Sequence, residues 1–431
     1  MRMALFKREA NMSFTQKYPE LYHSSFCRIL RAVRNWYKNI VRFLTWKFRL
    51  PLLIIVRRNY IRKLKKMQKQ EKIKVAFIVS DNRKWKGVSL YKKLLFDQRF
   101  TPLVLVTVLQ NTNYQNDANY IFFKQRNYNV FAIANLADLR KYKPDIVFCQ
   151  QPTGLMDDFS PFRLSKYALC FYFPYGIAAN INSSRIWNIR KLFFLMLYKQ
   201  FLFSLDCVRL FEERGMFNVI ATGSPQLDVY SEPVKNNPWR YQEKMKIIYA
   251  PHHSFSKLRS QFATFAWNGK QILQMAKNDP CTEWIFKPHP LFPITAIQEK
   301  IMTKQEVDEY FTEWAQIGQV YDKGDYIDLF RTSDLMITDS DGFLTEYLPT
   351  GNPVIYLISP NSAVRSHVSQ KSSRHYYKVH NLTELEQVFD MLVKERKDPL
   401  KAERQKDAEE IIYNSADKIY NELLKILGEK K

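Results

Sequence analysis

The sequence predicts a two-lobe α/β protein in which each lobe is a doubly wound parallel sheet, preceded by a basic amphipathic helical extension. Three observations lead to this prediction. From residue 73 onward, short apolar runs alternate with helical or loop stretches. Prolines and polar residues interrupt the alternation at residues 229–245, and the first 72 residues differ from the rest in charge.

The extension, residues 1–72, carries 19 lysines and arginines but only 3 acidic residues. Aromatic and aliphatic residues recur among these cations at spacings of three and four, which is typical of an amphipathic helix. The apolar run at residues 50–56 falls short of the roughly 20 residues needed to cross a bilayer. We therefore expect residues 21–66 to lie on an anionic membrane surface. The alternatives are packing on the chain's own lobe and nucleic-acid binding, but no specific nucleic-acid partner is expected because no recognised binding module follows.

The first lobe is predicted at residues 73–228. Residues 192–205 are apolar almost all round and predict one buried or interfacial helix, and short runs at 206–211 and 218–222 complete the lobe. The strands before them are predicted at residues 74–79, 102–109, 129–134, 145–150 and 168–173.

After the linker at residues 229–245, the second lobe is predicted at residues 246–397, followed by one charged amphipathic helix at 398–431. Ligands of such folds bind at the carboxyl ends of the strands. We therefore looked for reactive side chains directly after each strand. The strands of this lobe are predicted from residue 246 and at residues 284–287, 319–321, 335–338 and 353–357.

Three of the seven histidines follow predicted strands: His252 and His253 follow the first strand of the second lobe, and His289 follows the next. Histidine can donate to phosphate oxygens or accept a proton, and both tasks are needed when a nucleotide leaves. Lys287 would supply a positive charge beside them. Singly, each histidine is as readily explained as a hydrogen-bonded loop residue; their occurrence in two strand-end motifs favours function.

The segment Thr338, Asp339, Ser340 and Gly342 is typical of a helix start, where a side-chain oxygen caps the helix and backbone N–H groups could hold an anion. Its plain alternative is an ordinary helix cap. Glu346, one turn later, could accept hydrogen bonds from a ribose diol or could be a first-turn acidic residue favoured by the helix dipole.

The sequence contains neither a P-loop nor a GxGxxG motif, which disfavours a kinase or a dehydrogenase. The five cysteines are widely spaced and never form a CxxC pair. We therefore expect no zinc site and no disulfide framework. No cofactor is expected beyond a nucleotide-activated donor.

The chain resembles the CDP-glycerol glycerophosphotransferase family of teichoic-acid and capsule synthesis. The resemblance lies in the motifs around residues 222–228, 249–251, 287–290 and 334–339. It implies a GT-B fold, a CDP-linked polyol donor bound by the second lobe, no metal requirement, and a lipid-linked or polymer acceptor. It also implies that His289 contacts the donor pyrophosphate, that Asp339 and Ser340 begin the phosphate-holding helix, and that Glu346 lies near the nucleoside.

Two positions depart from this family. Its first lobe carries a His-Gly pair, with the histidine as base, where this chain has Tyr175 and Gly176. Because tyrosine has a pKa near 10, we expect the base either to lie elsewhere, at His252 or His253, or to be missing. The family's Thr-Asp-Tyr-Ser-Ser is Thr-Asp-Ser-Asp-Gly here, which adds Asp341. The same segment also resembles the Thr-Asp-Ser-Gly-Gly element of non-hydrolysing UDP-N-acetylglucosamine 2-epimerases, but their Gly-Thr-Arg-Pro-Glu opening is missing.

The expected function is transfer of a glycerol-phosphate or related polyol-phosphate group from a CDP-activated donor to a surface polymer. This would take place peripherally at the cytoplasmic face of a bacterial membrane. The alternatives are a GT-B glycosyltransferase that uses a nucleotide sugar, a non-catalytic nucleotide-binding or assembly protein and, more distantly, an epimerase.

Overall fold

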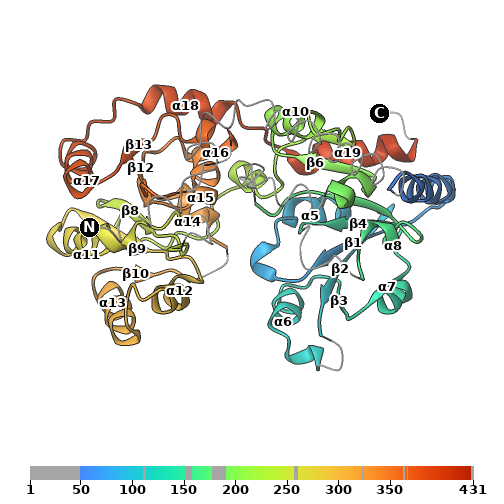
Figure 1. The fold of residues 1–431 in the computed structure, drawn as a ribbon, viewed down its shortest axis with the longest axis horizontal. Helices are drawn as coiled ribbons and strands as arrows, with labels where there is room; N and C mark the ends of the chain where they lie inside the picture. Colours follow the sequence, from blue (N-terminus) through green and yellow to red (C-terminus); the bar gives the residue numbers. More distant parts are fainter. Residues whose placement is uncertain are drawn as a thin grey trace, which may run out of the picture. The chain divides into compact units, whose positions relative to one another are not determined.

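The computed structural model describes residues 49–109, 113–151, 158–176, 191–256, 261–322, 325–362, 365 and 367–428. Two all-parallel sheets organise the chain from residue 73 onward, as predicted (Figure 1). The first has seven strands in the order β3-β2-β1-β4-β5-β6-β7. The strands are β1 (Ile73–Val79), β2 (Phe100–Thr107), β3 (Val130–Ile133), β4 (Ile146–Cys149), β5 (Leu169–Tyr172), β6 (Lys199–Leu202) and β7 (Val219–Ala221).

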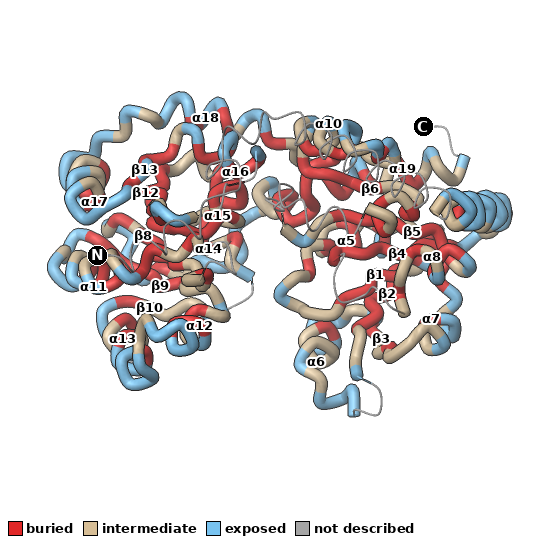
Figure 2. The backbone as a smooth tube through the Cα atoms, viewed as in Figure 1, coloured by how far each residue is buried: buried red, intermediate tan, exposed pale blue. Residues whose placement is uncertain are grey.

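Aromatic rings stack across neighbouring strands in the core of the first lobe. Phe148 of β4 lies 5.1 Å from Phe77 of β1 and 5.4 Å from Phe171 of β5, between ring centroids, and Phe171 lies 5.7 Å from Phe201 of β6. All four rings are fully buried, and Figure 2 shows the buried strands inside each lobe. The helices of this lobe are α5 (Val88–Phe96), α6 (Ala118–Gln125), α7 (Leu136–Tyr142), α8 (Pro161–Leu164) and α10 (Leu205–Glu212).

Two predictions for the end of the first lobe are wrong. Residues 206–211, predicted as a short strand-like run, lie within helix α10. The Ser204 hydroxyl caps this helix by accepting the backbone N–H of Cys207. The segment 192–205, predicted as one helix, is helical only to residue 196 and then forms strand β6. An apolar run that is buried on all sides has no periodicity that separates a helix from a strand.

The second sheet has six parallel strands in the order β10-β9-β8-β11-β12-β13. They are β8 (Met245–Ala250), β9 (Thr282–Phe286), β10 (Gln319–Val320), β11 (Leu335–Thr338), β12 (Val354–Leu357) and the unpredicted β13 (Tyr377–Val379). The strand order reverses between β8 and β11, and ligands of doubly wound folds bind at such a reversal. The helices are α11 (Phe265–Asn278), α12 (Phe292–Gln298), α13 (Lys304–Ile317), α14 (Ile327–Arg331), α15 (Asp341–Glu346), α16 (His367–Ser372) and α17 (Leu382–Phe389), after which residues 390–394 form a π-helical turn.

The carboxyl-terminal segment forms two helices, α18 (Lys401–Glu409) and α19 (Ser415–Leu427), rather than the single predicted helix. Asn414 separates them because it adopts a left-handed conformation, with φ of 58°. Helix α19 packs on α5 of the first lobe. Asp228 of the first lobe accepts the backbone N–H groups of Ser415 and Ala416, at 2.7 and 2.8 Å, and so caps α19.

Residues 49–67 of the basic extension are helical. Leu50, Ile54 and Ile55 expose 52%, 44% and 42% of their surface. Among the described residues, every helix is too short or too polar to span a bilayer. The predictions for residues 1–48 lie outside the described part of the chain.

Candidate functional site

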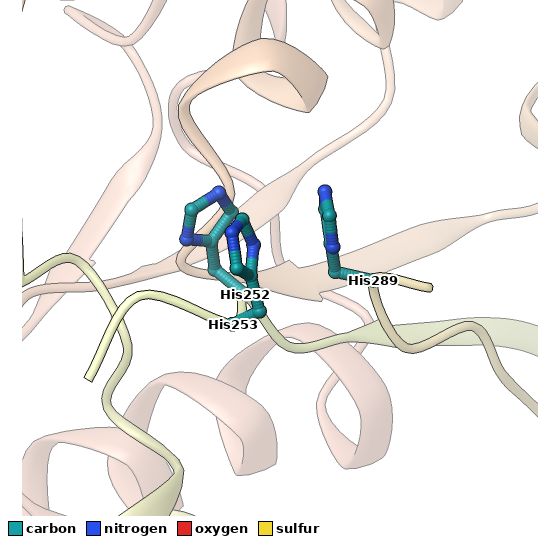
Figure 3. Close-up of side chains that lie close together, drawn as sticks. All are labelled: His252, His253 and His289. Carbon is teal, nitrogen blue, oxygen red and sulfur yellow. The ribbon is translucent and has the colours of Figure 1, made fainter. Parts of the chain in front are cut away.

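The parallel topology brings the three predicted histidines together. His252 and His253 follow β8, and His289 follows its neighbour β9. The ring centroid of His289 lies 3.8 Å from that of His253 and 5.3 Å from that of His252. The ring centroids of His252 and His253 lie 4.4 Å apart. Figure 3 shows the three imidazoles side by side. We call them the histidine cluster.

Backbone groups fix the tautomer of two of these rings. Leu291 donates its backbone N–H to Nδ1 of His289 at 3.0 Å, and Ser254 donates its backbone N–H to Nδ1 of His252 at 3.2 Å. The Ser254 hydroxyl lies 2.8 Å from the same Nδ1 and can also donate to it. A ring nitrogen that accepts such a bond carries no proton, so the proton of each neutral imidazole is on Nε2. Both rings therefore offer an N–H donor at Nε2.

This tautomer bears on whether the cluster suits a metal ion. One ring nitrogen from each histidine lies within 4.8 Å of the others, a separation that a metal could bridge. However, coordination through Nε2 of His252 or His289 would place the proton on Nδ1, opposite a backbone N–H. Two donors would then face each other, so the cluster suits an anion better than a cation.

Two of the three imidazoles, those of His252 and His289, are uncharged at neutral pH. Burial, with smaller contributions from nearby cations, lowers the pKa of His289 to about 3. Burial and the adjacent imidazoles also lower the pKa of His252 well below its usual 6.5. An uncharged imidazole still donates from Nε2, so the donor function survives burial while the cost of a buried charge is avoided.

Asp339 holds the loop that carries the cluster. Its carboxylate accepts the backbone N–H of His252 at 2.6 Å, and the backbone N–H and hydroxyl of Thr264 at 2.6 and 2.8 Å. The side chain is fully buried. Thr338 is also fully buried and donates its hydroxyl to the carbonyl of Ala250 at 2.6 Å. The side chains of both residues position the loop, and their role in donor binding stays a prediction.

Asp341, the carboxylate that departs from the family motif, is paired with a buried arginine. Arg365 donates to it at 3.1 Å and to the carbonyl of Asp339 at 3.2 Å. The guanidinium also lies 3.9 Å from the ring centroid of Phe262 and 4.9 Å from that of Tyr356. Since Asp341 and Arg365 expose only 8% and 9% of their surface, each charge depends on the other for compensation.

Lys287 lies in an aromatic cage. Its Nζ is 4.6 Å from the ring centroid of Tyr326, 5.6 Å from that of Tyr321 and 5.7 Å from that of Phe343. No carboxylate of the described residues lies within 4.0 Å of it. Burial and the positive charge of Lys86 lower the pKa of Lys287 to about 8. Lys287 is therefore a buried cation that an anionic ligand could pair with.

Glu346 is also buried, with 5% of its surface exposed. Its Oε2 accepts the Tyr326 hydroxyl at 2.5 Å and the side-chain amide of Gln226 at 3.1 Å, while its backbone carbonyl accepts the Tyr230 hydroxyl. Any contact of the Glu346 carboxylate with a ribose would therefore involve Oε1.

The remaining predicted residues are divided between the two lobes. Ser340 precedes α15 without a side-chain capping bond, and Gly342 has open space where a Cβ would be. Tyr175, which is 38% exposed, follows β5 in the first lobe, next to Gly176. Lys84 lies 5.5 Å from the Tyr175 ring.

Sequence reasoning missed Arg365, Lys86 and Gln226. Arg365 lies beyond β12 and belongs to no strand-end motif. No feature of the sequence distinguishes Lys86 from the many other lysines. Gln226 belongs to the 222–228 motif, so its position after β7 was a usable signal.

These two parallel α/β lobes, with the histidine cluster at the strand-order reversal of the second lobe, have the GT-B fold, as predicted. No protein-family model and no curated protein matches the sequence.

Solved structures match over most of the chain. The UDP complex of S. aureus MnaA has 14% sequence identity and a TM-score of 0.58, covering 83% of this chain and 99% of that chain. A UDP-GlcNAc 2-epimerase from Neisseria meningitidis bound to UDP-GlcNAc has 16% identity and a TM-score of 0.53, covering 82% and 100%. A variant of the wall teichoic acid polymerase TagF has 11% identity and a TM-score of 0.56, covering 92% and 99%. At these identities the likeness establishes the fold.

Proposed function

We propose that this protein is a transferase that moves a glycerol-phosphate or related polyol-phosphate group from a CDP-activated donor to a membrane-linked surface polymer. The observation that carries the proposal is the histidine cluster, in which two backbone-fixed tautomers present Nε2–H donors beside the buried cation Lys287. Neutral donors and one cation suit a pyrophosphate. The motif resemblance supports the polyol-phosphate donor.

In the proposed reaction, the oxygen of an acceptor hydroxyl attacks the phosphorus of the polyol phosphate. A new P–O bond forms, and the bond from that phosphorus to the bridging pyrophosphate oxygen breaks. CMP leaves with the electron pair, and the proton of the hydroxyl passes to a general base. His252 and His289 would donate to the departing phosphate, while Lys287 would compensate its charge. No step in this scheme calls for a metal ion or a cofactor.

The base that we propose is His253. The residues of the first lobe, 73–228, include no histidine, and the lone pair on Nδ1 of His252 is already used by Ser254. His253 stacks on His289 and so lies close to the proposed phosphate site. His252, earlier an equal candidate, is better suited to donation.

Two substitutions of His289 test the role of its Nε2. Asparagine keeps an acceptor for the backbone N–H of Leu291 but removes the distal donor, whereas glutamine can place an amide N–H near the position of Nε2. One hydrogen bond to a charged group contributes about 1.5–3 kcal/mol. We therefore expect His289→Asn to slow CMP release from CDP-glycerol roughly 10- to 100-fold, and His289→Gln to lose less. The exposed His380→Gln serves as control, and normal CMP release by His289→Asn would refute the assignment.

A thermal-shift panel of CDP-glycerol, CDP-ribitol, CMP, UDP and UDP-sugars tests the donor, since a ligand that binds only the folded state raises its stability. A cytidine-selective shift supports the proposal. A uridine-selective shift would favour the second candidate, a glycosyltransferase that uses a nucleotide sugar. Nucleotide binding without turnover would favour a non-catalytic protein.

We also propose that the enzyme acts peripherally at the cytoplasmic face of a membrane, through its basic extension. Tyr60 is buried and donates its hydroxyl to the carbonyl of Met196 at 2.8 Å, so a truncation must stop well before it. Deleting residues 1–48 should leave the lobes folded and weaken binding to anionic vesicles. Unchanged vesicle binding would contradict this role.

A further inference from the structure

A second concentration of positive charge lies at the amino-terminal ends of the strands in the first sheet. The candidate residues described above follow the carboxyl ends of strands. The cavity at the amino-terminal ends has a volume of about 780 Å³, within the range of pockets that hold small ligands. Lys72 and Lys74 lie at the start of β1, Thr101 lies near the start of β2, and Pro144 and Asp145 directly precede β4. In a parallel sheet these amino-terminal ends share one edge. We call this cavity the basic pocket.

The lining of the basic pocket is strongly unbalanced in charge. It has eight lysines and arginines but one carboxylate, Asp145. That carboxylate is engaged, because it accepts Lys63 Nζ at 2.7 Å and the backbone N–H of Lys74 at 2.9 Å. Lys74 directs its own ammonium to the carbonyl of Tyr142, at 3.4 Å. Asp145 thus holds one lysine in place and compensates little of the remaining charge.

The other six cations have no acidic partner. Within the part of the chain that the structure describes, no carboxylate lies within 4.0 Å of any of their charged groups. All six are solvent-exposed, so water keeps them charged, but gathering them around one cavity costs repulsion that an anion would relieve. They are Arg62, Lys66, Lys72, Arg140, Lys143 and Lys166.

The pocket also has features that suit a bound ligand rather than bulk counter-ions. The Arg140 guanidinium lies 5.3 Å from the Tyr167 ring centroid, which limits its freedom. Neutral hydrogen-bonding groups of Asn59 and Thr101 lie among the cations. Lysine and arginine together recognise phosphate groups, arginine by paired N–H donors and lysine as a point charge.

We propose that the basic pocket is a second anion site, which takes a ligand bearing more than one phosphate group. The two possible sources are a soluble phosphorylated molecule and the headgroup of an anionic phospholipid. The inference is independent of the proposed transferase function, because it depends on the amino-terminal edge of the first sheet and involves none of the residues of the histidine cluster.

The test compares two triple variants of the full chain that change its net charge equally. Lys72→Gln/Lys143→Gln/Lys166→Gln removes three cations of the basic pocket that lie outside residues 21–66, the segment proposed to contact the membrane. Lys270→Gln/Lys304→Gln/Lys378→Gln removes three exposed lysines of the second lobe. Both variants keep the donor site, so a difference between them reports only on the basic pocket.

The first measurement is titration calorimetry with inorganic tripolyphosphate at low salt. We expect the basic-pocket variant to bind at least tenfold more weakly than the control variant. Equal affinities in the two variants would overturn the proposal, whatever the transferase activity of either protein.

A vesicle assay then identifies the source of the ligand. If the basic-pocket variant also loses binding to vesicles of phosphatidylglycerol and phosphatidylcholine at least tenfold relative to control, the ligand is a lipid headgroup. If it loses only tripolyphosphate binding, the ligand is a soluble phosphorylated molecule. Either result supports the anion site.

Discussion

Replacing Arg365 should show that its positive charge compensates the buried carboxylate of Asp341. Arg365→Met keeps the approximate length of the side chain and its contacts with the Phe262 and Tyr356 rings, but removes the charge. Asp341 would remain 8% exposed without its partner at 3.1 Å. Leaving one charge of a buried pair uncompensated typically costs about 3–5 kcal/mol.

For a cooperative unit of about 150–250 residues, 1 kcal/mol corresponds to a shift of roughly 2–4 °C in melting temperature. A loss of about 3 kcal/mol therefore predicts a decrease of roughly 6–12 °C. The double variant Asp341→Asn/Arg365→Met should recover most of this stability, because replacing both charged partners by neutral groups removes the uncompensated charge. Differential scanning calorimetry of the wild type, both single variants and the double variant gives the coupling energy.

The reasoning fails if the two substitutions are additive, because additivity would mean that Arg365 does not compensate Asp341. It also fails if Arg365→Met melts within a degree of the wild type. A double variant that regains stability but still binds nucleotide weakly would separate the structural role of the pair from any contact of Arg365 with the ligand.

Two further predictions concern single side chains. Lys287, whose pKa is lowered to about 8, is charged below that pH, so nucleotide diphosphate affinity should fall about tenfold as the pH rises through 8 to 9.5. Titration calorimetry should show a flat profile for Lys287→Met and a wild-type profile for Lys270→Met; a sloping Lys287→Met profile would contradict this. Asp228→Ala should uncap α19 at a cost of about 1–2 kcal/mol and speed hydrogen exchange in that helix severalfold. Unchanged exchange rates would show that packing on α5 alone holds it.

Most of the fold could be predicted because its strands are short, apolar and separated by helical stretches. The first strand of each lobe starts within one residue of its predicted position, at Ile73 and Met245. Two of the failures have the same cause. Strand β6 continues an apolar run that begins as a helix, and β13 is only three residues long. In both places the periodicity is too weak or too brief to identify a strand.

The site residues that directly follow a strand could be predicted from the sequence. His252 and His289 are 37 positions apart in sequence, but the pairing of β8 with β9 makes their loops neighbours. Arg365 could not be found in this way, because its guanidinium reaches Asp341 from an irregular loop. The role of Asp339 was misread for a related reason: a motif gives the residue type, whereas the direction of its carboxylate is set by Thr264 and the backbone of His252.

The two proposed anion sites should differ in their sensitivity to salt, and this contrast follows from how each is charged. At the proposed donor site His252 and His289 are neutral, and the cations Lys86, Lys287 and Arg365 are matched in number by the carboxylates Asp339, Asp341 and Glu346. These groups are largely buried, so mobile ions screen them little. The basic pocket instead gathers exposed, unmatched cations, whose attraction for an anion falls once the screening length drops to about 8 Å at physiological ionic strength. Raising salt from about 20 to 150 mM should therefore weaken tripolyphosphate binding much more than CDP-glycerol binding. Equal salt dependence would mean that the donor site is held together by exposed charge after all, and that its neutral imidazoles contribute little to binding.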